Sequence, residues 1–151
     1  IAAGMSSLVR MGRWHGWLAW REPLVLILHL GYGWLGLALV ALGGSLLGVG
    51  LQAAEALHML TAGAVGTMTL GVMTRASLGH TGRPKTVGPM TIAIYSLVTL
   101  GALLRVVVPS PSAPTAVTHL VLACAALGWS GAYVLFALGY GPLLCRPSLD
   151  E

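Results

Sequence analysis

The chain has 151 residues, of which 56% are hydrophobic and only 8% are charged. Soluble domains carry about a quarter charged residues, so this composition excludes a water-soluble globular protein. Long unbroken apolar runs also argue against the short alternating strands of a β-barrel. We therefore expect an all-α fold, a polytopic bundle of transmembrane helices. The formal charge of +4 comes from basic residues dispersed in predicted loops, which predicts no nucleic-acid partner.

Residues 1–22 are predicted to be a cytoplasmic juxtamembrane segment. Its three arginines, Arg10, Arg13 and Arg21, have three tryptophans between them: Trp14, Trp17 and Trp20. Arg and Trp mixed in this way favour the headgroup region of a bilayer. The first residue, Ile1, is not a methionine, and the opening has no signal-peptide pattern. We therefore expect the chain to be the C-terminal part of a larger protein whose N-terminal helices precede it.

A transmembrane bundle is predicted over residues 23–144, followed by a cytoplasmic tail at 145–151. Apolar runs long enough to cross a bilayer predict four spans, at about 23–42, 54–75, 89–108 and 115–138. Pro23 and Pro89 suit the first turn of a helix, where the missing N–H has no intrahelical partner. The prolines in the stretch 109–114 predict a short stiff turn between the last two spans.

The distribution of basic residues predicts the topology. They occur before the first span, between the second and third, and in the tail, whereas the other two connections contain none. Under the positive-inside rule, both ends of the chain and the loop at 76–88 are cytoplasmic. The default partner of the basic residues at that loop is the lipid headgroup region. These residues are Arg75, His80, Arg83 and Lys85.

This topology brings Glu55, His58, Arg105 and His119 to one level near the outer membrane face. Ionisable groups inside spans are costly and usually face the bundle interior. Two imidazoles are suitable ligands for haem iron or copper, an arginine suits a haem propionate, and Glu55 is placed to orient His58. Alternatively, each histidine is an interfacial polar residue, Arg105 extends to headgroups, and Glu55 only pairs with Arg105.

Three further residues are weaker candidates. Met59 is a possible soft ligand, but it points about 100° away from His58 on a helix, and core packing is the simpler interpretation. His29 lies about one-third of the way across the first span from the cytoplasmic side. It predicts either a second, inner site or a structural hydrogen bond. Cys124 and Cys145 show no spacing typical of a disulfide, zinc or redox motif.

One long motif resembles a known family. The run HMLTAGAVGTMTL at 58–70, continued by MTRASLGHTGR at 73–83, closely resembles the signature of the NnrS family, as do LHLGY at 28–32 and Arg105. The resemblance covers essentially the whole chain. It implies a bacterial inner-membrane protein of about a dozen helices that contains haem and copper and acts in denitrification and the response to nitric oxide. It supports His58 as a metal ligand, and His29 more weakly.

Three functional hypotheses follow. The first is a haem- and copper-containing membrane protein of nitric oxide tolerance, with nitric oxide as its small-molecule ligand. The second is a permease whose intramembrane polar residues line a solute path. The third is a structural or assembly subunit in which the histidines only form hydrogen bonds between helices. Neither a nucleophile–base arrangement nor a phosphate loop is readable, so no enzymatic reaction is predicted.

Overall fold

The structure, a computed structural model, describes residues 1–14, 16–107 and 114–148, without the side chain of Trp17. The described residues form helices and no strand, which confirms the all-α prediction. In chain order the helices are α1 (Ala2–Gly12), η1 (Gly16–Arg21), α2 (Pro23–Leu46), α3 (Ala53–His58), η2 (Met59–Val65), α4 (Gly66–His80), α5 (Pro89–Val106) and α6 (Thr115–Leu144).

Four helical units are long and apolar enough to cross a membrane, as predicted. They are α2, the continuous unit α3–η2–α4 at Ala53–His80, α5 and α6. The second unit extends past Arg75 because helix-compatible residues follow it, and the chain turns only at Gly82, where φ is +64°. The expected end of the third span at residue 108, the proline-rich turn at 109–113 and residues 149–151 of the tail lie outside the described part of the chain.

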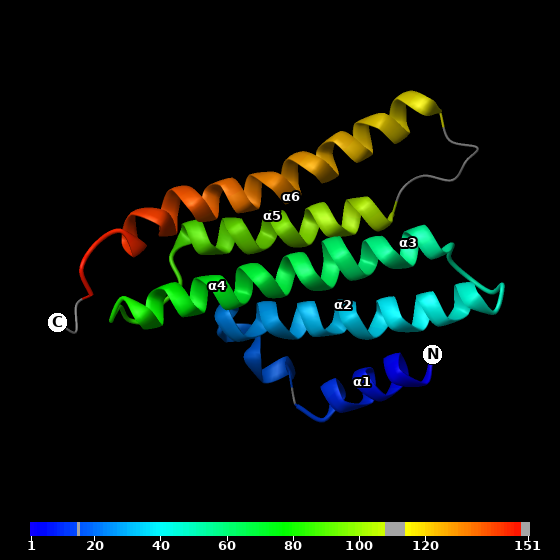
Figure 1. Ribbon diagram of the computed structural model, residues 1–151, viewed down its shortest axis with the longest axis horizontal. Coiled ribbons are helices and arrows are strands. Elements are labelled where there is room, and N and C mark those ends of the chain that lie inside the picture. Colours follow the sequence, from blue (N-terminus) through cyan, green and yellow to red (C-terminus); the bar gives the residue numbers. More distant parts are fainter. Residues whose placement is uncertain (15, 108–113, 149–151) are drawn as a thin grey trace.

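The helices lie side by side in the order α1, α2, α3–η2–α4, α5 and α6 (Figure 1). We call one end of the bundle the His58 end; it contains the end of α2 and the starts of α3 and α6. The opposite end, with the loop between α4 and α5, is the Lys85 end. The N-terminus lies toward the His58 end and the C-terminus lies at the Lys85 end.

The segment 1–22 divides into two parts. Helix α1 packs along α2, where a Cβ built on Gly4 would lie 2.7 Å from the Gly36 carbonyl oxygen, and Ile1 lies against Gly43. Close approach of small residues is the usual way in which helices pack in a membrane. Helix η1, which contains Arg21, lies at the start of α2. The first dozen residues instead pack along the side of α2 and do not lie beyond the Lys85 end of the bundle.

The packed core occupies the Lys85 half of the bundle. Its buried residues come from four helices: Leu24, Ile27, Leu70, Leu78, Ile94, Tyr95, Val98, Ala132, Phe136 and Tyr140. Two hydroxyl pairs tie neighbouring helices together there. Thr74 bonds Tyr95 between α4 and α5, and Thr91 bonds Tyr140 at 2.6 Å between α5 and α6. These contacts hold the Lys85 half closed.

Helices α5 and α6 touch most closely at Gly101. A Cβ built there would lie 2.6 Å from the backbone nitrogen of Trp129 and 2.9 Å from the carbonyl oxygen of Ala125. Only glycine allows this approach. The contact places the Trp129 side chain against the second membrane unit, where it helps to form the site described next.

Candidate functional site

Helix η2 is the feature that shapes the site. Its residues, Met59–Val65, form a π-helix between α3 and α4, and such wide turns are frequent at functional sites. The sequence analysis did not predict it. The run Ala62-Gly63-Ala64 was the sequence feature that could have indicated it, because small residues let a neighbouring side chain approach a distorted helix. Such a run is equally common in regular membrane helices, so it does not distinguish the two.

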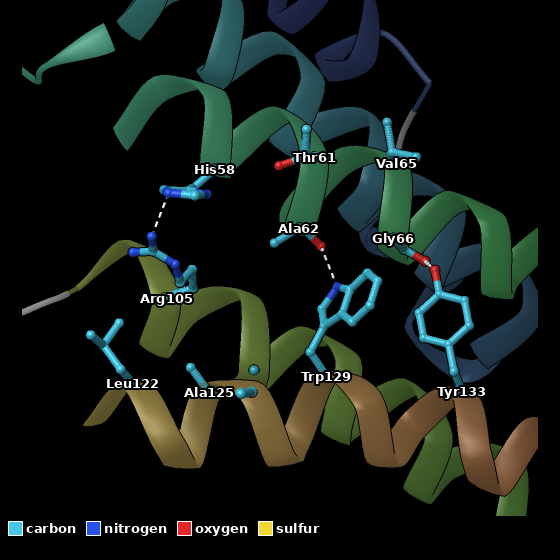
Figure 2. Close-up of a pocket in the computed structure, with 12 residues that line it drawn as sticks. His58, Thr61, Ala62, Val65, Gly66, Arg105, Leu122, Ala125, Trp129 and Tyr133 are labelled. Atoms are coloured by element: carbon cyan, nitrogen blue, oxygen red, sulfur yellow. Dashed lines mark hydrogen bonds between the residues drawn. The ribbon is translucent and has the colours of Figure 1, made fainter. Parts of the chain in front are cut away.

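A cavity of about 630 Å³ lies between η2, α5 and α6 (Figure 2). Its lining is mostly apolar and consists of His58, Thr61, Ala62, Val65, Gly66, Gly101, Arg105, Leu122, Ala125, Ala126, Trp129 and Tyr133. The α6 residues of the lining run from Leu122 to Tyr133, which covers roughly 16 Å at 1.5 Å per residue. Ligand pockets typically measure about 300–1,000 Å³ and are apolar with a few polar groups, and this cavity has both properties.

The polar end of the cavity is formed by His58 and Arg105. Both side chains are half-buried, and the Arg105 guanidinium donates a hydrogen bond to Nε2 of His58. A guanidinium has donors only, so Nε2 acts as the acceptor and the imidazole is neutral, with its proton on Nδ1. Figure 2 shows the two side chains facing each other across the mouth of the cavity.

Aromatic side chains from α6 form the other wall. The indole N–H of Trp129 donates to the Ala62 carbonyl at 3.2 Å, and the Tyr133 hydroxyl donates to the Gly66 carbonyl at 3.1 Å. These two bonds connect α6 to the second membrane unit. A Cβ on Gly66 would lie 2.6 Å from the indole nitrogen of Trp129, so the indole requires glycine at this position.

The four residues expected at the outer level are only partly brought together. His58 and Arg105 are in contact, as described. Glu55 instead accepts a hydrogen bond from the backbone N–H of Gln52 at 2.8 Å and caps the start of α3. His119 is exposed on α6 and does not line the cavity. Met59 is buried and also lies outside the lining.

His29 lies apart from the cavity, on α2. Its Nδ1 is 3.0 Å from the Val25 carbonyl oxygen, which can only accept, so Nδ1 carries the proton. Nε2 is buried and has no hydrogen-bond partner among the residues that the structure describes. Trp14 packs edge-on against the ring at 5.9 Å, and a Cβ on Gly16 would lie 2.7 Å from Cδ2. A carbonyl on one nitrogen and a free lone pair on the other is the usual state of a metal-binding imidazole.

The neighbours of His29 include a cationic group that the sequence analysis did not connect with it. Arg10 donates from Nε to the Tyr32 hydroxyl at 2.9 Å, and its guanidinium carbon lies 5.3 Å from the centre of the Tyr32 ring. The rings of Trp14 and Tyr32 are 4.8 Å apart. Helix α1 thus places the Arg10 side chain next to the part of α2 that contains His29. This placement could be predicted only if the packing of α1 against α2 were known.

The described residues contain no group of three or more His, Cys, Asp or Glu side chains that could hold a metal ion. A metal bound by these residues would have fewer than three such side chains as ligands. Haem iron suits such ligands, since one or two axial imidazoles complete its coordination. His29 has an Nε2 lone pair without a partner among the described residues, but little room for a haem beside it. His58 has the cavity beside it, but its Nε2 accepts a hydrogen bond from Arg105.

The four basic residues expected at one loop lie in different surroundings. Arg75 and Lys85 line a cavity of about 640 Å³ at the Lys85 end. His80 lines a neighbouring pocket that also contains Arg75 and Lys85. Arg83 is half-buried, and its Nη1 is 3.5 Å from the Thr81 carbonyl oxygen. The larger cavity also contains Arg21, which the sequence assigned to a different segment.

These features define a polytopic α-helical membrane protein with a largely apolar cavity that ends in a histidine–arginine pair. The family model described as "NnrS protein" matches residues 1–148. The chain belongs to the NnrS family, as its motif indicated. A search of curated proteins and a search of solved structures gave no match.

Proposed function

We propose that this chain forms part of a haem- and copper-containing protein of the bacterial inner membrane that binds nitric oxide and acts in nitric oxide tolerance, linked to denitrification. In this proposal the Lys85 end faces the cytoplasm and the His58 end faces outward. The observation that carries the proposal is the cavity of about 630 Å³ with a neutral imidazole and a guanidinium at its mouth. Family membership supports it independently.

The residues at the cavity fit a haem. The His58 imidazole is neutral, and a neutral ring nitrogen is what iron binds. Arg105, released from His58, has the planar donor fork that suits a propionate. The remaining lining is mostly apolar, which suits a porphyrin face. When bound, the haem would supply an iron atom that takes nitric oxide as a ligand.

The surroundings of the cavity suit the gas as well. Nitric oxide is small and uncharged, so it enters the hydrocarbon region of a bilayer without the desolvation cost of an ion. The lining side chains Val65, Leu122 and Ala126 offer it an apolar wall. Trp129 and Tyr133 have their polar atoms already bonded to backbone carbonyls, so the wall presents few competing donors.

His29 is our candidate for the second metal. Its buried Nε2 lone pair has no partner within the described part of the chain, and its other nitrogen is held by a carbonyl, which orients the ring. A copper ion would need further ligands in addition to His29. The copper part of the proposal therefore rests on the family resemblance and on this one side chain.

The test is the optical spectrum of the full-length protein, purified in detergent, oxidised and then reduced. We expect a haem spectrum in the parent and its loss or altered ligation in His58→Ala. His119→Ala is the matched control, because this exposed histidine lies outside the cavity, and its spectrum should equal the parent's. A haem spectrum lost in His29→Ala but intact in His58→Ala would contradict the cavity as the haem site.

A permease is the second candidate, and the π-helix is the observation in its favour. Transporters often build their substrate sites from interrupted membrane helices, and η2 interrupts the second membrane unit beside the cavity. A colourless parent protein that a solute stabilises against thermal unfolding would favour the permease over the haem protein.

A further inference from the structure

The Lys85 end carries a second cavity with a different character. It measures about 640 Å³ and combines basic side chains with an apolar floor. Its lining comes from η1, α2, α4, the α4–α5 loop and α5: Arg21, Glu22, Pro23, Leu24, Val25, Arg75, Lys85, Thr86, Val87 and Ile92. Three cations and one carboxylate leave a formal excess of two positive charges.

The basic side chains of this cavity are not neutralised within the described residues. Arg75 and Lys85 are exposed, and neither forms an ion pair or hydrogen bond in the part of the chain that the structure covers. Arg21 packs its guanidinium 4.9 Å from the centre of the Trp20 ring. Trp20 is 64% exposed, and an exposed tryptophan beside an arginine is typical of the headgroup level of a bilayer.

An apolar groove lies next to this cavity, toward the bundle centre. Its lining residues lie on α2 and α5: Pro23, Leu26, Ile27, Leu30, Ile92, Tyr95 and Ser96. Pro23 and Ile92 line both the groove and the basic cavity, so the two adjoin each other. From Pro23 to Leu30 the groove covers roughly 10 Å along α2, at 1.5 Å per residue.

We propose that the basic cavity and the α2–α5 groove together bind one anionic phospholipid, with its phosphate beside Arg75 and Lys85 and an acyl chain along the groove. A basic pocket between membrane helices at the cytoplasmic side is a recurring site for anionic headgroups. The adjoining apolar groove distinguishes a lipid from a free phosphate ion, which would fill only the basic cavity. Glu22, which also lines the basic cavity, disfavours a lipid headgroup with a second negative charge.

The test is native mass spectrometry of the full-length protein in detergent micelles containing phosphatidylglycerol or phosphatidylcholine. The parent should retain phosphatidylglycerol preferentially. The variant Arg75→Gln/Lys85→Gln should lose roughly 25-fold in apparent affinity, equivalent to about 1 kcal/mol per basic residue. The matched control Arg13→Gln/Arg146→Gln removes the same charge from exposed positions outside the cavity and should bind as the parent does.

A second pair of variants tests the acyl chain. Ser96→Trp fills the groove from an exposed position on α5, whereas Leu100→Trp, one turn further along, lies outside it. We expect Ser96→Trp to lower phosphatidylglycerol binding and Leu100→Trp to leave it unchanged. Equal retention in the two glutamine double variants would overturn the proposal. Displacement by soluble glycerol phosphate as effectively as by lipid would also overturn it, because the groove would then contribute nothing.

Discussion

The residues at the cavity act as pairs, each with a partner on another helix. His58 is neutral because Arg105 offers it only donors. Trp129 occupies its position because residue 66 is a glycine and because the Ala62 carbonyl accepts its N–H. The motif around His58 contained the histidine and the small residues, and the predicted topology placed Arg105 at the same level; the Trp129 and Tyr133 partners on α6 depend on helix packing.

Trp129→Phe should destabilise the bundle by about 1–2 kcal/mol. The variant loses one interhelical hydrogen bond inside the membrane, worth about 0.6–1.7 kcal/mol, and part of its contact with Gly66. The free energy of unfolding in mixed detergent would measure this. Trp20→Phe is the control, because its side chain is 64% exposed and its effect should stay within about 0.5 kcal/mol. Equal stability of the two variants would contradict the described role of the indole.

At the scale of elements, the composition and the apolar runs predicted four membrane units, and the structure contains them. A packed core lies in the Lys85 half of the bundle, with the basic cavity at that end, and a mostly apolar cavity lies between η2, α5 and α6 toward the His58 end. That difference could not be predicted, because it depends on the π-helix in the second unit. The apolar pattern of a membrane helix does not distinguish a π-helix from an α-helix, since both satisfy the backbone internally.

Adding one residue to η2 should separate His58 from Arg105. The wide turn already holds an extra residue, so an alanine inserted after Thr61 turns α3 by about 100° relative to α4. The measurement is thiol cross-linking of His58→Cys with Arg105→Cys, in a Cys124→Ala/Cys145→Ala background, after cleavage in the loop at 81–88. We expect a cross-link with η2 intact and none after the insertion. Equal cross-linking in both chains would show that η2 does not set the position of His58.

In the whole molecule, the N-terminal segment lies elsewhere than its sequence suggested, because α1 packs along α2. Its arginines suggested a surface loop, but Ile1 lies beside Gly43 at the far end of α2 and Arg10 bonds Tyr32. The positive-inside rule depends only on the number of basic residues in each loop, so it could not predict a helix packed against the bundle. The N- and C-terminal ends of the described chain consequently lie at opposite ends of the bundle (Figure 1).

The proposed orientation predicts the accessibility of two cysteines to a membrane-impermeant maleimide. Leu47→Cys, in the exposed connection after α2, should be labelled in intact cells. Native Cys145, exposed beyond the last turn of α6, should be labelled only after the inner membrane is opened. Each is tested with the other cysteines replaced by alanine. Labelling of both residues from the same side would contradict the described bundle. Labelling of Cys145 in intact cells, with Leu47→Cys labelled only after the membrane is opened, would show that the bundle has the opposite orientation.

We propose that His58 binds the haem iron in the cavity. The most direct test of this claim is the haem midpoint potential of the full-length protein with His58→Met, which replaces an imidazole ligand by a thioether. Because methionine ligation raises the potential of a haem, we predict a higher midpoint potential and a changed reduced spectrum, with His119→Met at the parent value. A His58→Met protein with the parent's potential and spectrum would contradict the claim.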